Sequence, residues 1–250
     1  MSAAITPQEM TQFVREGIVI RRNFVASELI NRARRMIDGW YHGKMQSDLI
    51  ESYTQRTFAP ELGTHPDVLA LFHRSGISDL VASLVAETQP VSTTQIQIRI
   101  PDIHGATQSP KAMHVDGVAC PHLDPAELRT FTLLVGVVLS EITDRDSGAL
   151  RYVPGGHLRM AEWFRTEWSV GMTDQVPPNI DDEEGTPLLG QPGDVLLMHH
   201  LVPHAVGRNT STTPRVMAYF RVAHARHAHQ RLEALRDPWL EYTPLQPLAT

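Results

Sequence analysis

The sequence has little of several features that mark common classes of protein. A single cysteine, Cys120, excludes an intrachain disulfide and a zinc site built from cysteines. Only two of the 22 basic residues are lysines, Lys44 and Lys111, and the formal net charge of −6 argues against nucleic acid as a partner. No apolar run approaches the roughly 20 residues that span a bilayer, and we expect no membrane partner. No signal peptide is recognisable, so we expect a cytoplasmic protein.

The 250 residues, 42% hydrophobic and 20% charged, are sufficient for a large buried core. Because the chain contains no repeat, low-complexity tract or flexible linker, we predict one domain over 1–250. The predicted secondary structure changes along the chain. Residues 1–90 are predicted to be mostly helical, 91–222 to be a β-rich core, and 223–250 to form a C-terminal extension. The segment 158–190 interrupts the core as either a lid or a surface excursion.

Local patterns place the elements within these regions. Thr6 and Glu9 form a capping box around Pro7 and predict a helix to about Glu16. Ser27 is expected to cap a second helix. Residues 94–100 alternate strictly between polar and apolar, which predicts a half-buried strand. Turn signals separate this strand from further predicted strands at 131–139, 150–153, 194–198 and 215–222. Short strands at this spacing are typical of a sandwich or barrel.

Histidine is abundant, with 13 residues, and some histidines are candidates for metal binding. A His-x-Asp pair on a strand places both side chains on one face, and a distant histidine completes a two-His-one-carboxylate iron site. Chance alone gives one or two such pairs in this composition, and the chain has three. The pairs starting at His65 and His122 adjoin helix-start signals. The third, His114 and Asp116, follows a predicted strand and is the best candidate.

A third ligand would come from another strand. Residues 193–204 offer His199, His200 and His204 after a turn and a strand signal. A second possible source of the third ligand is a group of three histidines near the C-terminus. This group lies among arginines and is better interpreted as a solvated polar face. Its members are His224, His227 and His229.

Three blocks of residues resemble the Fe(II)/2-oxoglutarate dioxygenases of the phytanoyl-CoA dioxygenase type. The first is HVDG at 114–117, and the second is SGALRYVPGGH at 147–157, similar to a proline-glycine turn of that family. The third runs from 193 to 204 and continues to Arg215. In the family an arginine follows the distal iron histidine by eleven positions, and Arg215 follows His204 by eleven. This spacing favours His204 over its two neighbours as the ligand.

The resemblance implies a mainly β fold with flanking helices, a double-stranded β-helix of the cupin-like jelly-roll type. It also implies that His114, Asp116 and His204 bind Fe(II). Arg215 would pair bidentately with the distal carboxylate of 2-oxoglutarate, a geometry that lysine cannot copy. Two further cosubstrate contacts are expected by analogy with the family. They are Thr132, which could instead fill a core strand, and Gln97, which could instead be the exposed side of its strand.

The family's reaction consumes O2 and 2-oxoglutarate, releases succinate and CO2, and hydroxylates an unactivated C–H bond. The retained carboxylate at Asp116 favours hydroxylation over halogenation, whereas desaturation, ring formation and epimerisation stay open. We expect a free small molecule as substrate, such as a secondary metabolite or a modified amino acid. Candidate substrate contacts are Arg99, His104, Lys111, Trp163, Phe164, Tyr219 and Arg221. Arg99 and Arg221 could instead be ordinary strand-face charges.

Two other classes of function compete with this hypothesis. A cupin-type metalloenzyme that does not use 2-oxoglutarate would keep the three metal ligands but would have no use for Arg215 at its offset. A non-catalytic jelly-roll binding module would have no reason to keep His114, Asp116 and His204 together. The sequence leaves the oligomeric state undetermined. Cys120 is expected to be a small buried hydrophobe.

Overall fold

The protein is represented by a computed structural model that describes residues 4–102, 108, 113–117, 129–169 and 185–249. Lys111, His104 and Cys120 lie outside the described residues, as does most of the second half of the predicted lid or excursion. None of the helices in the described ranges combines the length and apolar character that crossing a bilayer requires.

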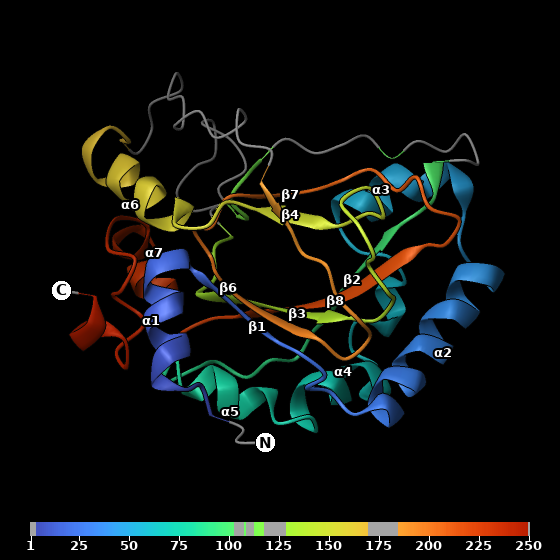
Figure 1. The fold of residues 1–250 in the computed structure, drawn as a ribbon, viewed down its shortest axis with the longest axis horizontal. Coiled ribbons are helices and arrows are strands. Elements are labelled where there is room, and N and C mark those ends of the chain that lie inside the picture. The colour runs from blue at the N-terminus through green and yellow to red at the C-terminus, as the bar shows by residue number, and fades with distance from the viewer. Residues whose placement is uncertain (1–3, 103–107, 109–112, 118–128, 170–184, 250) are drawn as a thin grey trace.

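Two antiparallel sheets form the centre of the molecule (Figure 1). The larger sheet has five strands in the order β1-β6-β3-β8-β2, and the smaller has three in the order β5-β4-β7. The strands of the larger sheet are β1 (Ile18–Arg21), β6 (Val195–His199), β3 (Leu133–Val138), β8 (Arg215–Val222) and β2 (Gln95–Arg99). Those of the smaller sheet are β5 (Thr186–Pro187), β4 (Leu150–Tyr152) and β7 (His204–Val206).

The larger sheet is buried on both faces because its strands carry apolar side chains in both directions. All six residues of β3 are buried, as are seven of the eight residues of β8. Leu134, Met217 and Tyr219 point to one face and pack with Leu150 and Tyr152 of the smaller sheet. Alternate residues of the same strands pack on the other face against the helices. Two facing antiparallel sheets with flanking helices confirm the predicted jelly-roll class.

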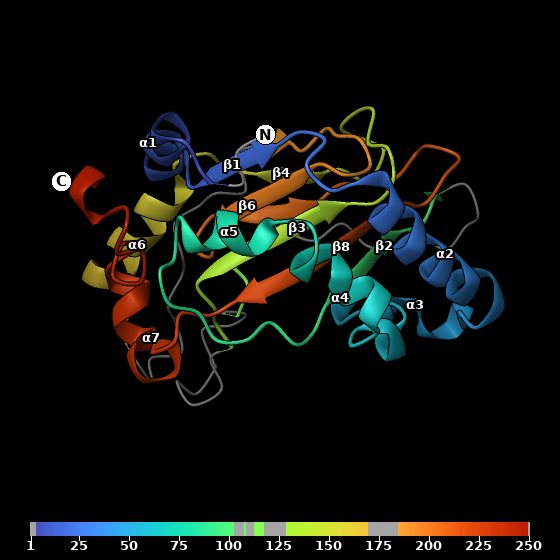
Figure 2. The same cartoon turned by 90° about the horizontal axis from the view of Figure 1, so that it is seen from below.

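In the described part of the chain, seven α-helices flank this centre. They are α1 (Pro7–Glu16), α2 (Ser27–Gly43), α3 (Ile50–Gln55), α4 (Pro66–His73), α5 (Ile77–Ala82), α6 (Gly156–Thr166) and α7 (His227–Arg236). Helices α4 and α5 cross the outer face of the larger sheet, seen from below in Figure 2. The predicted capping box at Thr6 and Glu9 is confirmed, since the Thr6 hydroxyl accepts from the Glu9 backbone N–H and the Glu9 carboxylate accepts in return. Ser27 begins α2 but makes no cap, because Ala26 occupies the N-cap position.

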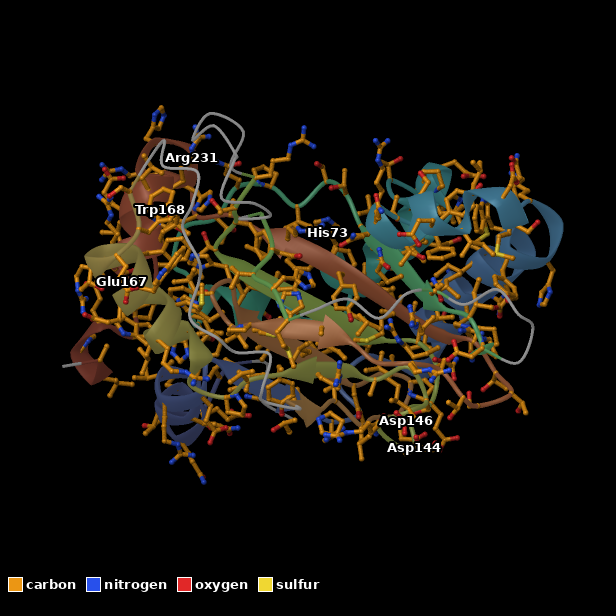
Figure 3. The ribbon with its side chains drawn as sticks, turned by 90° about the horizontal axis from the view of Figure 1, so that it is seen from above. His73, Asp144, Asp146, Glu167, Trp168 and Arg231 are labelled. Carbon is orange, nitrogen blue, oxygen red and sulfur yellow. The ribbon has the colours of Figure 1, made fainter. Side chains whose placement is uncertain are left out.

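The described part of the predicted lid begins as helix α6, which packs on α7. Trp163 and Phe164 of α6 are buried in an apolar cluster with Leu235 of α7. At the end of α6, the Arg236 guanidinium lies over the Trp168 ring at 5.9 Å from its centroid. Figure 3 shows Glu167, Trp168 and Arg231 together at one end of the molecule, away from Asp144 and Asp146 at its lower edge. Helix α6 is therefore a packed part of the fold.

Candidate metal centre and cosubstrate site

Two histidines that are 90 positions apart meet through a short antiparallel bridge. The backbone N–H of His114 donates to the carbonyl of His204 at 3.0 Å, and the reverse bond is 2.9 Å long. His204 begins β7, whose pairing with β4 fixes its backbone opposite Tyr152. The two imidazole centroids are 4.7 Å apart. The bridge thus brings one member of the His-x-Asp pair beside the distal histidine.

Asp116 completes the group two residues after His114. Its Oδ1 lies 3.5 Å from His114 Nε2 and 3.8 Å from His204 Nε2. The potential ligand atoms of the three residues lie within 4.8 Å of one another, and in the described ranges no other group of His, Cys, Asp or Glu side chains has this geometry. Two imidazole nitrogens and one carboxylate oxygen are the donors of the two-His-one-carboxylate iron face.

The electrostatics hold these side chains in the forms that bind metal ions. Burial lowers the pKa of His204 to about 4, so its imidazole is neutral at pH 7. Its Nδ1 donates to the Val202 carbonyl at 3.0 Å, which leaves the Nε2 lone pair for a metal. Burial alone would raise the pKa of Asp116, but the hydrogen bond with His114 outweighs it, together with the charge of Arg221 and the charge that His204 carries in the acidic range where Asp116 titrates. The Asp116 pKa therefore lies below its ordinary value.

The three side chains line a cleft between the two sheets. Gln97, Tyr219 and Arg221, which the sequence indicated as cosubstrate or substrate contacts, also line it. Burial raises the pKa of Tyr219, so its hydroxyl stays protonated. The other lining residues are Gln55, Gln95, Leu134, Leu150 and Val206. Gln95 shares a strand face with Gln97, a relation visible in the sequence, whereas nothing in the sequence singles out Gln55 on α3.

Arg215 lies on the same strand as two cleft residues. Positions 215, 219 and 221 alternate along β8 and share its inward face. Arg215 is 2% exposed, and its Nε donates to the Gly148 carbonyl at 2.7 Å. Its Nη1 is buried without a hydrogen-bond partner in the described part of the chain. A buried guanidinium nitrogen with no partner is costly, so this position fits an anionic ligand that supplies the missing acceptor.

Arg99, one of the candidate substrate contacts, lies beside Arg215 and not in the cleft lining. The two residues are Cα partners on β2 and β8, and Arg99 is 3% exposed. One of its nitrogens, Nη2, donates to the Gln108 carbonyl at 2.5 Å. Burial lowers the pKa of Arg99, and the neighbouring charge of Arg215 adds to this effect.

The structure corrects the expected role of Thr132. Its side chain is fully buried, and its hydroxyl donates to Glu241 Oε2 at 2.5 Å while accepting from the His224 backbone N–H at 2.7 Å. The single O–H of Thr132 is therefore used inside the protein and is not free to donate to a cosubstrate carboxylate. The alternative, that Thr132 fills a core strand, agrees with these contacts. Trp163, a candidate substrate contact, lies in the α6–α7 cluster instead of the cleft lining.

Several other histidines, grouped around the C-terminal segment, take part in its packing. His199 stacks between His200 and Tyr242, and His157 Nε2 donates to the Val14 carbonyl at 3.2 Å. The expected solvated face near the C-terminus is wrong for His224 and His227. Both are buried, and His227 Nδ1 lies 2.9 Å from both Glu241 oxygens. The sequence could not predict the contacts between these histidines and Glu241, because Glu241 is not part of a recognisable motif.

Comparison with known proteins places the chain among oxygenases. The family model of phytanoyl-CoA dioxygenase (PhyH) matches residues 13–217. No curated protein sequence matches the chain. A solved structure of an alpha-ketoglutarate-dependent carbocyclase, SnoK from nogalamycin biosynthesis, is similar at 17% identity, covering 91% of this chain and 90% of that one with a TM-score of 0.62.

Two other solved structures are similar over most of their length. The apoform of EctD from S. alaskensis has 17% identity, with 88% of this chain and 77% of that one covered and a TM-score of 0.66. HygX from Streptomyces hygroscopicus, solved with nickel and 2-oxoglutarate bound, has 15% identity, 88% coverage of both chains and a TM-score of 0.60. At such identities the likeness establishes the shared fold. Together with the family match, it confirms the predicted fold and family.

Proposed function

Because the chain belongs to the phytanoyl-CoA dioxygenase family, we propose that it is an Fe(II)- and 2-oxoglutarate-dependent oxygenase that hydroxylates a small molecule. The overall reaction consumes O2 and 2-oxoglutarate and releases succinate and CO2. The main support for the proposal is that two groups of side chains occur in the same protein. One is the His114, Asp116 and His204 group, and the other is the buried, partly unsatisfied guanidinium of Arg215.

The donors present fit Fe(II). A neutral His204 and an ionised Asp116, with His114 beside them, supply the nitrogen and oxygen donors that non-haem iron takes. Bound iron together with 2-oxoglutarate and O2 supplies the oxidising power that no side chain of the protein has. The role of the chain is to hold these groups, to orient the substrate's C–H bond and to keep water out.

Arg215 would bind the distal carboxylate of 2-oxoglutarate. Its fork of N–H donors matches a carboxylate bidentately, and burial strengthens such charge-assisted bonds. The neighbouring Arg99 adds positive potential, and the Gly148 turn closes over both side chains. Gln97 and Tyr219 line the cleft that holds the metal group and would contact the cosubstrate or substrate.

The substrate is expected to be a free small molecule with polar and apolar parts. The cleft combines three glutamines and Arg221 with Leu134, Leu150 and Val206, which suits such a molecule better than a polymer. Similar structures support this class, since SnoK is described from nogalamycin biosynthesis and EctD was solved with 2-oxoglutarate and 5-hydroxyectoine. The similar structures also include an epimerase, SnoN. Proteins of this fold therefore carry out different reactions, and hydroxylation is the outcome that we propose for this chain.

An anaerobic visible spectrum tests the proposed function. Purified protein mixed with Fe(II) and 2-oxoglutarate is expected to give a weak metal-to-ligand charge-transfer band, and His204→Ala is expected to lose it. Because His200 is packed away from the cleft, His200→Ala serves as a matched histidine control that should keep the band. If a protein with bound metal shows no band, 2-oxoglutarate is not the cosubstrate and a cupin-type metalloenzyme becomes the better account.

A further inference from the structure

One side chain of the cleft contacts a candidate metal ligand directly. Arg221 Nη2 donates to Asp116 Oδ2 at 2.8 Å. The other oxygen of the same carboxylate, Oδ1, faces the Nε2 atoms of His114 and His204. The two oxygens of Asp116 therefore have different partners, a guanidinium on one and the two imidazoles on the other.

Arg221 is held by its strand and by one aromatic ring, although its side chain is 38% exposed. It lies on β8, the strand next to β3, where its Cα is paired with that of Leu134. Its guanidinium carbon lies 5.4 Å from the centroid of the Phe131 ring, a cation–π contact that adds to its fixation. Phe131 is itself buried, with 3% exposure. Arg221 thus presents its donors from a strand of the larger sheet, close to the end of that strand.

Asp116, in contrast, has little backbone support. The isolated bridge ends at His114, and Asp116 lies in a turn followed by Gly117, which has a φ of +79°. A carboxylate on a turn can rotate, and it can offer a metal either one oxygen or both. The hydrogen bond from Arg221 removes this freedom, because turning Oδ2 toward the histidines would break it.

We propose that Arg221 is a positioning residue that holds Asp116 with only Oδ1 directed at the metal. This inference rests on the proposed function only in placing a metal ion at the three side chains. One oxygen and two nitrogens leave three positions of a six-coordinate ion open, the number needed for the chelating 2-oxoglutarate and for O2. This role differs from the substrate contact expected for Arg221 from the sequence.

Titration with Co(II) tests the proposal without 2-oxoglutarate or substrate. Arg221→Met keeps the apolar stem and removes the donors. It is expected to weaken Co(II) binding at least tenfold, because loss of the group that hydrogen-bonds to a metal ligand typically has an effect of this size. It should also change the visible Co(II) spectrum. Arg22→Met is the matched control. Arg22 also pairs with an aspartate, Asp194, at 2.8 Å but away from the cleft, and its variant should bind Co(II) as the wild type does.

Two results would overturn the proposal. One is an Arg221→Met variant with the Co(II) affinity and spectrum of the wild type. The other is tighter binding, which would mean that the guanidinium acts mainly by repelling the ion. If Arg221→Met does not fold, Arg221→Gln takes its place with the same outcomes. If the wild type binds Co(II) but not 2-oxoglutarate, the proposed function is contradicted. The comparison of Co(II) binding between the wild type and Arg221→Met still tests the role of Arg221.

Discussion

Arg99 and Arg215 face each other as Cα partners on neighbouring strands, and both side chains are buried. Burying two like charges side by side is unfavourable unless an opposite charge compensates. Arg215 makes no ion pair within the described ranges, and its Nη1 has no acceptor there. We propose that the pair forms a site for an anion, and the distal carboxylate of 2-oxoglutarate is the anion that the proposed reaction requires.

Arg215→Met should weaken binding of 2-oxoglutarate by about 10- to 100-fold, because a charge-assisted hydrogen bond contributes about 1.5–3 kcal/mol. Arg215→Lys should recover little of this loss, since a point charge cannot make the bidentate contact. Titration of the anaerobic Fe(II) protein with 2-oxoglutarate measures the affinity. The metal affinity serves as a control and should not change. Unaltered 2-oxoglutarate binding in the Met variant would contradict the assignment.

Gly148→Ala should lower both stability and 2-oxoglutarate affinity. The glycine has a φ of +78°, which L side chains rarely adopt, and an added Cβ would lie 3.0 Å from the Arg99 side chain and 3.1 Å from Arg215 Cβ. We expect a loss of about 1 kcal/mol or more in the free energy of unfolding. Urea unfolding and a 2-oxoglutarate titration measure the two effects. Gly39→Ala is the control, because a Cβ at Gly39 meets no atom within 4 Å.

Thr132→Val should destabilise the protein without affecting 2-oxoglutarate binding. The substitution keeps the shape of the side chain but removes the hydroxyl bound to Glu241, whose side chain is 1% exposed. Leaving a buried carboxylate with one partner fewer costs about 1–3 kcal/mol. Urea unfolding checks the loss of stability. A weakened 2-oxoglutarate affinity at unchanged stability would instead restore the cosubstrate role that the family resemblance implied for Thr132.

The metal-free protein should lose stability as the pH falls below about 6.5. Burial lowers the pKa of His157 to about 4 and that of His200 to about 3, whereas an unfolded histidine titrates near 6.5. Between these values the unfolded chain binds protons that the folded chain does not, so stability rises with pH and is fully present above pH 6.5. At pH 5 each histidine should cost about 2 kcal/mol. Urea unfolding at pH 7.5 and pH 5 measures the difference, and equal stabilities would contradict the buried, neutral state of these rings.

The strand pattern predicts much of the fold, because a strand buried on one face has alternating apolar residues and a strand buried on both faces has a continuous apolar run. The stretch 215–222 is a strand with those bounds, and the alternating stretch 94–100 contains β2. The motif spacing also indicates the three candidate metal ligands that the structure brings together. These features depend on local periodicity or on short motifs.

Long-range polar partners could not be predicted in the same way. The pairing of Thr132 with Glu241 joins residues 109 positions apart, and that of Asp116 with Arg221 joins residues 105 positions apart. Neither pair has a spacing that a pattern could reveal. His227 was expected to be solvated for a similar reason, since its neighbours in sequence are polar, whereas in the fold it is buried and contacts the buried Glu241 carboxylate.

The most direct test of the central claim is a crystal structure of the protein grown anaerobically with Ni(II) and 2-oxoglutarate. The account predicts one metal ion bonded to His114, Asp116 and His204, with 2-oxoglutarate chelating it and its distal carboxylate on the Arg215 guanidinium. A metal ion at other residues, or 2-oxoglutarate bound away from Arg215, would contradict it.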